Sequence, residues 1–599
     1  MMKIRSNPFL VFSFLLFSCL AGTVYAETEL EPIVVKHASY ASREEVLTSV
    51  LEEDEIEKIA ANTPEDILNY LSVDVQTRGF YGVKSDISLN ASTFQQVLIL
   101  VNGVPVNDPQ TAHHNLDLFF NKDDIERIEI IPASRSSVYG PNGIGGAINF
   151  VLKKPQGKKG KVSVAGGNNN LFEGKLDLTY GPQDFTNRLS IDHAQSDGCR
   201  YDTDFRTSTF FHSSAIEKDK ASLFVDVGYN EKEFGAYDFY TPGRNYPSKE
   251  WTNTGFFDVR GLLKGDRFTF APRFDFRQHH DKFMLDVTQP DLYLNHHRTD
   301  MFLAGGRFEF PCKGFQLSAG ADYGEDRITS NNLGKHDRQH WDAYVDSLWR
   351  FSDCLNAQVA LRVDDYSTFQ EELTGSVLLK YLFHDASDIY ATFGRSVRIP
   401  TFTELYYSDP TTGSDPDLKP EQALNFECGW NKKIFDGLDG SLSIFVRHEH
   451  DTIDFIKNAP SDPKFIATNI SEATTCGLNL FTRWWTTDKL SLDLRYFFAN
   501  KRTKDDGKIY KYGINYTKHM LDFGIDLGLP IGHNRMDVVM KKKPDRRAWV
   551  LVNDRFTFDV NKSFELFFEV YNLANVEYQE IEGIPESGRQ FKCGVQFQW

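Results

Sequence analysis

The sequence predicts a transmembrane β-barrel of about 22 antiparallel strands that follows a small N-terminal α+β domain. Three observations lead to this prediction. From about residue 158 onward, apolar and polar side chains alternate in segments of about ten residues separated by polar turns. The chain begins with the pattern of a secretory signal peptide, and it closes on an aromatic residue, Trp599.

Length and composition narrow the class of protein. With 599 residues the chain is too long for one ordinary core, so at least two domains are expected. No run of about 18 apolar residues follows the N-terminus, which excludes a helical membrane protein. The formal charge of −18 argues against a nucleic-acid partner. Aromatic residues make up 14% of the chain, which suits a β-rich membrane protein.

The first segment has a basic start at Lys3 and Arg5, an apolar stretch over 9–20, and small residues before Glu27. This pattern predicts a signal peptide over residues 1–26. A lipoprotein site at Cys19 is the weaker alternative, because the preceding residues fit that motif poorly. Cleavage after Ala26 places the mature chain outside the cytoplasm.

Six cysteines remain after cleavage, and they lie far apart in the sequence. They are Cys199, Cys312, Cys354, Cys428, Cys476 and Cys593. Without a CxxC pair they do not indicate a zinc site. Export permits disulfides, and the sequence leaves their pairing open.

The segment after the signal peptide has the signals of a small α+β domain. Thr63 and Pro64 form a helix start with an N-cap and a proline in the first turn. A shorter helix is expected over 54–61, and strands are expected over 87–89, 97–101, 104–106, 125–131 and 147–152. The glycine-rich run 139–146 suggests a phosphate loop, but a β-strand follows it where a phosphate loop requires a helix.

The remaining chain alternates with period two. Over 521–529, apolar Leu521, Phe523 and Ile525 oppose Asp522 and Asp526. A soluble β-sandwich would show the same alternation. The signal peptide, the number of such segments and the charges on one face of so many of them favour a membrane barrel.

Several motifs resemble the TonB-dependent outer-membrane receptors. NGVPVND (102–108), DIERIEII (124–131) and SSVYGPNGIGGAINFVLKKP (136–155) look like the plug domain of that family. The segments 398–421 and 571–591 resemble its barrel hairpins. The resemblance implies a plug at 41–155 inside a barrel at 156–599, located in the outer membrane of a Gram-negative cell and in contact with its lipid. The chain departs from the family at Asn90-Ala91, where Arg-Gly is usual.

The same resemblance implies a partner, TonB. The N-terminal segment 27–40 contains a short β-prone stretch at the position of the family's TonB box: Glu31, Pro32, Ile33, Val34 and Val35. An exposed extended segment can bind a partner by adding a strand to its sheet. We therefore expect TonB, in the inner-membrane energy-coupling complex, to bind there.

The expected activity is binding and transport rather than catalysis. No nucleophile motif such as GxSxG is present, so we predict no catalytic residues and no enzyme. Ligand contacts are expected from the outward plug loops and the barrel interior. The plug candidates are Phe80, Tyr81, Val83, Asp108, Gln110, His113 and His114. The alternative for each is an ordinary loop residue.

Three His-His pairs, at 113–114, 279–280 and 296–297, suggest haem or metal uptake. Neighbours on a strand point to opposite faces, however, so a pair chelates only from a loop. In the family that this chain resembles, haem receptors carry a histidine between the two barrel motifs, and residues 401–417 of this chain contain none. Haem uptake is therefore disfavoured.

The stretch 229–243 resembles a hairpin of the cobalamin receptors in this family, whose acidic loops bind calcium. Asp202, Asp204 and Asp238 are the corresponding calcium candidates, with a solvated acidic loop as the alternative. A plugged barrel suits a large, scarce nutrient that cannot diffuse through small porins. We expect active uptake of cobalamin or a related corrinoid, with a ferric siderophore as the alternative. Haem or a metal complex is less favoured than either.

Overall fold

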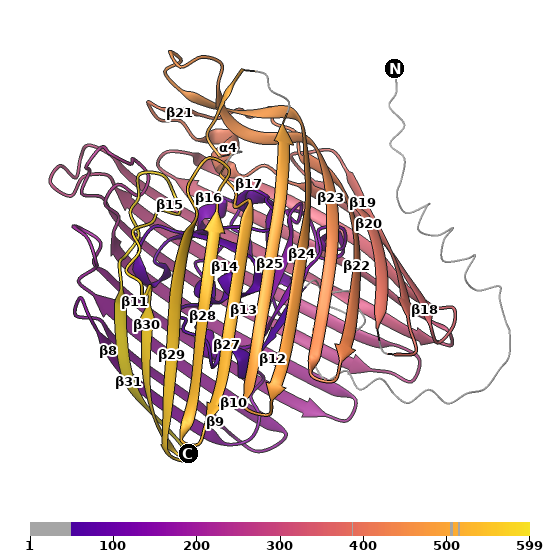
Figure 1. The fold of residues 1–599 in the computed structure, drawn as a ribbon. Helices are drawn as coiled ribbons and strands as arrows, with labels where there is room; N and C mark the ends of the chain where they lie inside the picture. Colours follow the sequence, from indigo (N-terminus) through magenta and orange to yellow (C-terminus); the bar gives the residue numbers. More distant parts are fainter. Residues whose placement is uncertain (1–48, 386, 504–506, 513–514) are drawn as a thin grey trace, which may run out of the picture. The chain divides into compact units, whose positions relative to one another are not determined.

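The computed structural model describes residues 49–385, 387–503, 507–512 and 515–599 (Figure 1). The predicted signal peptide and the 31–35 segment lie outside these residues. The described residues belong to one compact unit, in which an N-terminal plug lies inside a closed β-barrel. The predicted fold class is confirmed.

A five-stranded sheet forms the centre of the plug, with strand order β1-β6-β7-β4-β5. Its strands are β1 (Ser49–Glu52), β4 (Val97–Val101), β5 (Val104–Pro105), β6 (Ile125–Ile131) and β7 (Gly146–Leu152). Strands β4 and β7 pair in parallel, and the other pairs are antiparallel. Because β4 is covered on both faces, all five of its residues are buried, as its apolar run predicts.

The remaining plug elements are short. They are β2 (Asp74–Thr77) and β3 (Ser85–Ser88), the helices α2 (Glu53–Ile56) and α3 (Pro64–Leu68), and the 3₁₀ turns η1 (Asn69–Leu71), η2 (Phe80–Gly82), η3 (Phe94–Gln96), η4 (Ala112–His114), η5 (Lys122–Asp124) and η6 (Ser136–Val138). Thr63 caps α3 as predicted. The helix expected over 54–61 was wrong in length. Ile59, Ala60 and Ala61 are all buried, and a helix on the edge of a core buries only one face.

The barrel contains 22 long antiparallel strands. They are β8 (Lys159–Gly167), β9 (Phe172–Tyr180), β10 (Phe185–Ser196), β11 (Phe205–Lys218), β12 (Ala221–Gly235), β13 (Lys249–Lys264), β14 (Thr269–Met284), β15 (Leu294–Cys312), β16 (Phe315–Ser330), β17 (Gly334–Arg350), β18 (Leu355–Tyr366), β19 (Glu372–Leu382), β20 (Asp388–Arg398), β22 (Glu421–Phe435), β23 (Leu438–Lys457), β24 (Phe465–Thr487), β25 (Leu490–Thr503), β27 (His519–Leu529), β28 (Gly532–Lys542), β29 (Trp549–Asn561), β30 (Phe564–Tyr571) and β31 (Gln590–Gln598).

Pairing of β31 with β8 closes the barrel, so the sheet has no free edge. Two short strands, β21 (Thr412–Gly413) and β26 (Ile509–Tyr510), pair with the ends of the longer strands β24 and β23. The loop that carries α4 (Phe402–Tyr406) and β21 lies at the end opposite the C-terminus, which we call the loop end (Figure 1).

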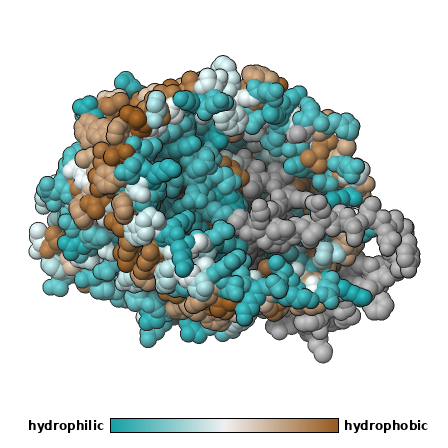
Figure 2. All heavy atoms as spheres, turned by 90° about the horizontal axis from the view of Figure 1, so that it is seen from below, coloured by the Kyte–Doolittle hydropathy of each residue, from teal (hydrophilic) through white to brown (hydrophobic). Residues whose placement is uncertain are grey.

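Barrel strands separate charge from apolar surface. On β14, Arg273, Asp275 and Arg277 point inward and are buried, whereas Phe274 between them is 37% exposed on the outside. The same outward face continues on β31, where Phe591 and Phe597 are exposed. In Figure 2, hydrophobic residues gather along the rim of the face viewed, around a hydrophilic middle. This is the pattern of a barrel that faces lipid outside and a polar interior.

No helix among the described residues is both long and apolar enough to cross a membrane.

The plug packs closely against the barrel wall. Phe119 stacks on Phe256 of β13, with ring centroids 3.9 Å apart. Gly228 on β12 and Gly394 on β20 make room for the plug, because a Cβ atom there would lie 2.3 Å from Phe119 and 2.1 Å from the carbonyl oxygen of Ser134. These contacts fix the position of the plug loops that form the candidate site.

Candidate functional site

Four aromatic rings meet where the plug loops reach the loop end of the barrel. Phe94 and His113 come from the plug, and Tyr240 and Tyr512 come from barrel loops. The rings of Phe94 and His113 are stacked, with centroids 4.3 Å apart, and Tyr512 meets Phe94 edge-on at 5.2 Å. We call these four residues the aromatic floor. All four keep part of their surface exposed, so a ligand can lie against them.

A charged network beneath the floor holds His113 in place. Asp86 accepts from His113 Nδ1 at 2.7 Å and pairs with Arg78 at 2.5 Å. Burial acts to raise the pKa of Asp86, but Arg78 and His113 outweigh it and hold that pKa well below its usual range. Burial lowers the pKa of His113, against the attraction of Asp86. The floor therefore rests on an ionised carboxylate and a paired guanidinium.

Two of the ligand candidates on the 80–83 loop are buried, and the third is half-buried. Tyr81 donates its hydroxyl to Glu173 at 2.6 Å and stacks on Phe205, and Val83 is also buried. Phe80 is half-buried and lies edge-on to Tyr571. The structure thus turns Tyr81 and Val83 toward the barrel wall rather than toward a free surface.

Asp108, Gln110 and His114 are also buried, at the seam between plug and wall. Asp108 pairs with Arg277 of β14 at 2.7 Å and accepts from the Thr299 hydroxyl at 3.1 Å. Of the seven predicted plug residues, Phe80 and His113 keep exposed surface, and only His113 belongs to the aromatic floor.

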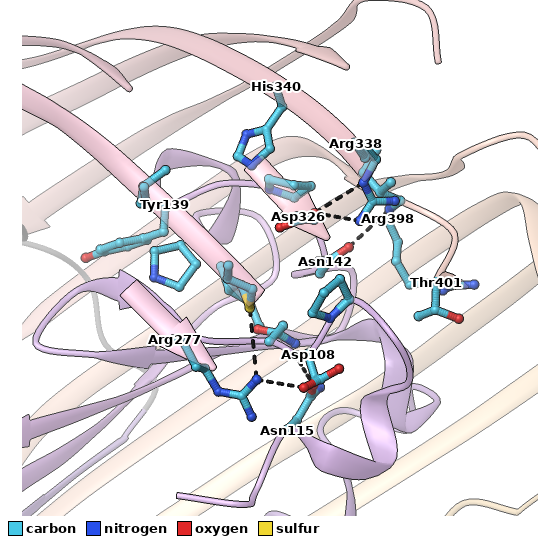
Figure 3. A pocket seen from close by; sticks show the side chains of 18 of the residues that line it. Asp108, Asn115, Tyr139, Asn142, Arg277, Asp326, Arg338, His340, Arg398 and Thr401 are labelled. Carbon is cyan, nitrogen blue, oxygen red and sulfur yellow. Dashed lines mark hydrogen bonds and ion pairs between the residues drawn. The ribbon is translucent and has the colours of Figure 1, made fainter. Parts of the chain in front are cut away.

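A cavity of about 110 Å³ lies between the plug and strands β14–β20 (Figure 3). Five arginines from the wall line it: Arg273, Arg277, Arg338, Arg362 and Arg398. Each is paired with a carboxylate, as Figure 3 shows for Arg277 with Asp108 and Arg338 with Asp326. With its cations neutralised in this way, the cavity is suited to water at the seam rather than to an anionic ligand.

The three calcium candidates are not gathered into one site. Asp238 uses both carboxylate oxygens to accept from the backbone amides of Gly243 and Asn245. Asp202 has one buried oxygen, Oδ2, without a hydrogen-bond partner among the described residues. Within the part of the chain that the structure describes, the only sets of three histidine or acidic groups with ligand atoms within 4.8 Å of one another lie elsewhere. This arrangement does not fit a calcium ion held by all three aspartates.

In each of the two histidine pairs on strands, one histidine faces the barrel interior and the other faces outward, as strand geometry predicts. His279 is fully buried inside, while His280 faces outward and is partly exposed. His297 is buried and His296 is exposed. Neither pair chelates as a pair, but His279 approaches His114 of the plug.

Sequence reasoning missed Phe94 and Tyr512 in the floor, and it included Tyr240 only as part of a longer motif. Phe94 lies three residues before the apolar run of β4, and Tyr512 lies in a loop rich in lysine and glycine. An aromatic side chain in a polar loop is a signal for an exposed contact, but it does not say which loops meet.

Comparisons with known proteins agree with this architecture. The family model described as "TonB dependent receptor-like, beta-barrel" matches residues 143–573, and the model described as "TonB-dependent Receptor Plug Domain" matches residues 43–147. The Vitamin B12 transporter BtuB of Photobacterium profundum is 22% identical over 565 residues, which cover 88% of this chain and 89% of the transporter.

Two solved structures share the fold. The ferric enterobactin receptor PfeA of Pseudomonas aeruginosa matches with a TM-score of 0.76 at 14% identity, over 92% of this chain and 99% of that receptor. The copper transporter OprC matches with a TM-score of 0.77 at 17% identity, over 94% and 99%. The family is one of receptors and transporters of the outer membrane. This chain belongs to the TonB-dependent receptors and is an outer-membrane protein.

Proposed function

We propose that this receptor takes up cobalamin or a related corrinoid across the outer membrane. The observation that carries the proposal is the match to a vitamin B12 transporter along nearly the whole of both chains, 88% of this one and 89% of the other. The resemblance of residues 229–243 to a cobalamin-receptor hairpin supports it, because Tyr240 from this stretch is part of the aromatic floor.

The chemistry of the floor supports a large ligand with little negative charge. Its four rings offer apolar area and edges for a broad, flat molecule. Arg78 beside Tyr240 is already paired with Asp86, which leaves Lys511, whose Nζ lies 5.3 Å from the centre of the Tyr512 ring. One lysine is a small positive charge on a chain with a formal charge of −18. A multiply anionic ferric chelate would gain little attraction from such a surface.

A ferric siderophore is the second candidate. The observation that favours it is the fold match to PfeA, whose structure is described as a complex with enterobactin. At 14% identity this likeness extends only to the fold. We rank the siderophore second because the vitamin B12 transporter matches in sequence along 88% of this chain, whereas the likeness to PfeA extends only to the fold.

We also propose that residues 31–35 bind TonB and couple uptake to the inner membrane. Support comes from family membership and from the β-prone character of the stretch. The segment lies outside the described residues.

A binding titration tests the ligand. Purified receptor in detergent is titrated with cobalamin and, in parallel, with ferric enterobactin. We expect cobalamin to bind at micromolar concentration or below, and we expect Tyr240→Ala and Tyr512→Ala each to weaken binding by about five- to tenfold. Tyr229→Ala is the matched control, because Tyr229 faces outward on the barrel. Tight binding of the ferric chelate without cobalamin binding would overturn the proposal.

Each titration is repeated with and without calcium. Asp202 and Asp204 share one loop, and Asp202 keeps a buried oxygen without a hydrogen-bond partner in the described part of the chain. If calcium orders this loop for ligand binding, affinity falls on chelation, and Asp202→Ala and Asp204→Ala remove the effect. Equal affinity in both conditions excludes a calcium requirement.

A further inference from the structure

A buried cluster joins the plug to the barrel wall just below the aromatic floor. His114 of η4 approaches His279 and Asp281 of β14, and all three side chains are buried. The two imidazole centroids are 4.4 Å apart, and His114 Nε2 lies 3.5 Å from Asp281 Oδ1. One ligand atom from each of the three residues lies within 4.8 Å of the others.

Two atoms in this cluster lack a hydrogen-bond partner among the described residues. They are Nε2 of His279 and Oδ1 of Asp281, and both are buried. Buried polar atoms in folded proteins almost always have a partner, so two of them facing one small space point to a ligand between them.

Neighbouring side chains orient the imidazoles for binding. The Thr254 hydroxyl lies 2.9 Å from His279 Nδ1, which leaves Nε2 directed into the cluster. Asp117 Oδ2 lies 2.8 Å from His114 Nδ1. Metal-binding histidines in proteins are held in this way, with the second ring nitrogen bonded to a carboxylate or another fixed group.

Two tautomers of His114 fit its contacts. In one, Nδ1 accepts a hydrogen bond from Lys84, whose Nζ lies 2.8 Å away, and the Nε2 proton points to Asp281. In the other, Nδ1 donates to Asp117, and the lone pair of Nε2 faces a carboxylate oxygen at 3.5 Å. The second arrangement opposes two acceptors, which a metal cation, a second proton on His114 or a water between them can stabilise.

The surrounding charge permits a cation. Asp117, Glu250 and Asp281 carry three negative charges, and Lys84 and Lys232 carry two positive charges. With neutral imidazoles, the cluster has a net charge of −1. Tetrahedral bonds of about 2.0–2.1 Å would place neighbouring ligand atoms roughly 3.4 Å apart, close to the spacing between His114 and Asp281.

We propose that His114, His279 and Asp281 bind one divalent transition-metal ion of the zinc class, and that this ion fastens the plug to strand β14. Two imidazoles and a carboxylate are a common ligand set for such ions. Asp117 offers a further oxygen, since its Oδ2 lies 3.7 Å from His279 Nε2. The proposal does not depend on the identity of the transported ligand.

The sequence supplies matched controls. His113 and His280 are direct neighbours of the two histidine ligands, but His113 turns to Asp86 and His280 faces outward. A second group, His448, His450 and Glu472, lies on the outer side of β23 and β24 and could bind zinc adventitiously. All variants are therefore made in a His448→Gln background.

The test measures zinc on the full-length receptor in detergent. Zinc is determined in protein isolated from zinc-supplemented cells and again after dialysis against micromolar Zn²⁺. We expect one equivalent in the background protein, in H113Q and in H280Q, and at least about tenfold weaker binding in H114Q and H279Q. Circular dichroism checks that each variant keeps its β-structure.

Two further measurements separate metal binding from a structural effect of substitution. Co²⁺ in place of Zn²⁺ should give the absorption of a tetrahedral site in the background protein and none in H279Q. Zinc should also slow hydrogen exchange of plug amides near His114 in the background protein alone. Absence of bound zinc in the background protein, or equal binding by H279Q, would overturn the proposal. The cluster would then be held by hydrogen bonds alone.

Discussion

Asp108 shows at the scale of one residue how the plug is held. Its carboxylate lies against the guanidinium of Arg277, and both groups are buried. Burial acts to raise the pKa of Asp108, but Arg277, His279 and His114 together outweigh burial and lower that pKa to about 2. An ion pair in this position contributes little as a pair, but removal of one partner leaves a buried unpaired charge.

We predict that Asp108→Asn destabilises the folded receptor by about 3–5 kcal/mol at neutral pH, because Arg277 loses its counter-charge. The folded pKa lies below the unfolded value of about 3.9, so the stabilisation by Asp108 is present above about pH 4 and is lost as the pH falls toward 2. Thermal unfolding at several pH values measures both effects. Between about pH 4 and pH 2, Asp108→Asn should lose less stability than the wild type. Asp417→Asn is the control, because Asp417 is exposed, and it should behave like the wild type.

Tyr81 gives a second test at this scale. Its backbone is left-handed, with φ of 65°, and this turns the ring onto Phe205 and the hydroxyl onto Glu173. We predict that Tyr81→Phe lowers stability by about 1–2 kcal/mol and leaves ligand affinity unchanged. A large loss of affinity with unchanged stability would instead place Tyr81 in the ligand site.

At the scale of the element, strands β12 and β20 of the barrel wall each carry a glycine, Gly228 and Gly394, where the plug approaches. On β20, a Cβ at position 394 would lie 2.1 Å from the carbonyl oxygen of Ser134, and backbone cannot move aside as a flexible side chain can. Strand β13 also has a glycine, Gly255, but nothing lies within 4 Å of a Cβ there. Substitutions at positions 394 and 255 therefore separate the effect of contact with the plug from the effect of replacing a glycine within a strand.

Gly394→Ala is therefore expected to push the plug from the wall and to cost about 1–3 kcal/mol. Gly255→Ala should be neutral or slightly stabilising, because alanine loses less entropy on folding. Hydrogen exchange of the plug amides measures the difference. Equal protection in the two variants would show that the wall tolerates a methyl group at position 394.

The elements could be predicted from the sequence where the pattern is local. Alternation of Asp522 and Phe523 places one inside and one outside the barrel, and Thr63 marks the start of α3. The Asn102-Gly103 turn was also predictable, since both residues adopt the positive φ that this pair favours.

The site was less predictable because its contacts join distant segments. Arg277 is 169 residues from Asp108, and no local pattern pairs them. Tyr81 and His114 lie in loops expected to face outward, but their final direction depends on Glu173 and His279 in the wall. Loop residues take their orientation from the surface they pack on, and that surface exists only after the barrel closes.

At the scale of the whole molecule, the closed barrel and its plug have different roles: the barrel spans the membrane and the plug closes its interior. The barrel has apolar side chains facing lipid and no free edge, so it is stable in the membrane. The plug fills the interior through buried ion pairs with the wall, including Lys84 with Glu250 and Asp74 with Lys541. A large ligand can pass only if some of these contacts are broken, which requires an energy source.

The final prediction concerns where that energy enters. The plug's first strand, β1, begins at Ser49, so a force on residues 31–35 would reach the plug through the intervening chain. Val34→Pro removes a backbone donor and restricts the preceding residue, so strand addition to TonB should fail. We expect cobalamin binding at the loop end to persist and energised uptake to fall to background, whereas Val34→Leu, which keeps the donor, should transport normally. Uptake of radiolabelled cobalamin by cells, measured beside binding to isolated outer membranes, separates the two steps. Normal uptake by the proline variant would show that coupling occurs outside this pentapeptide.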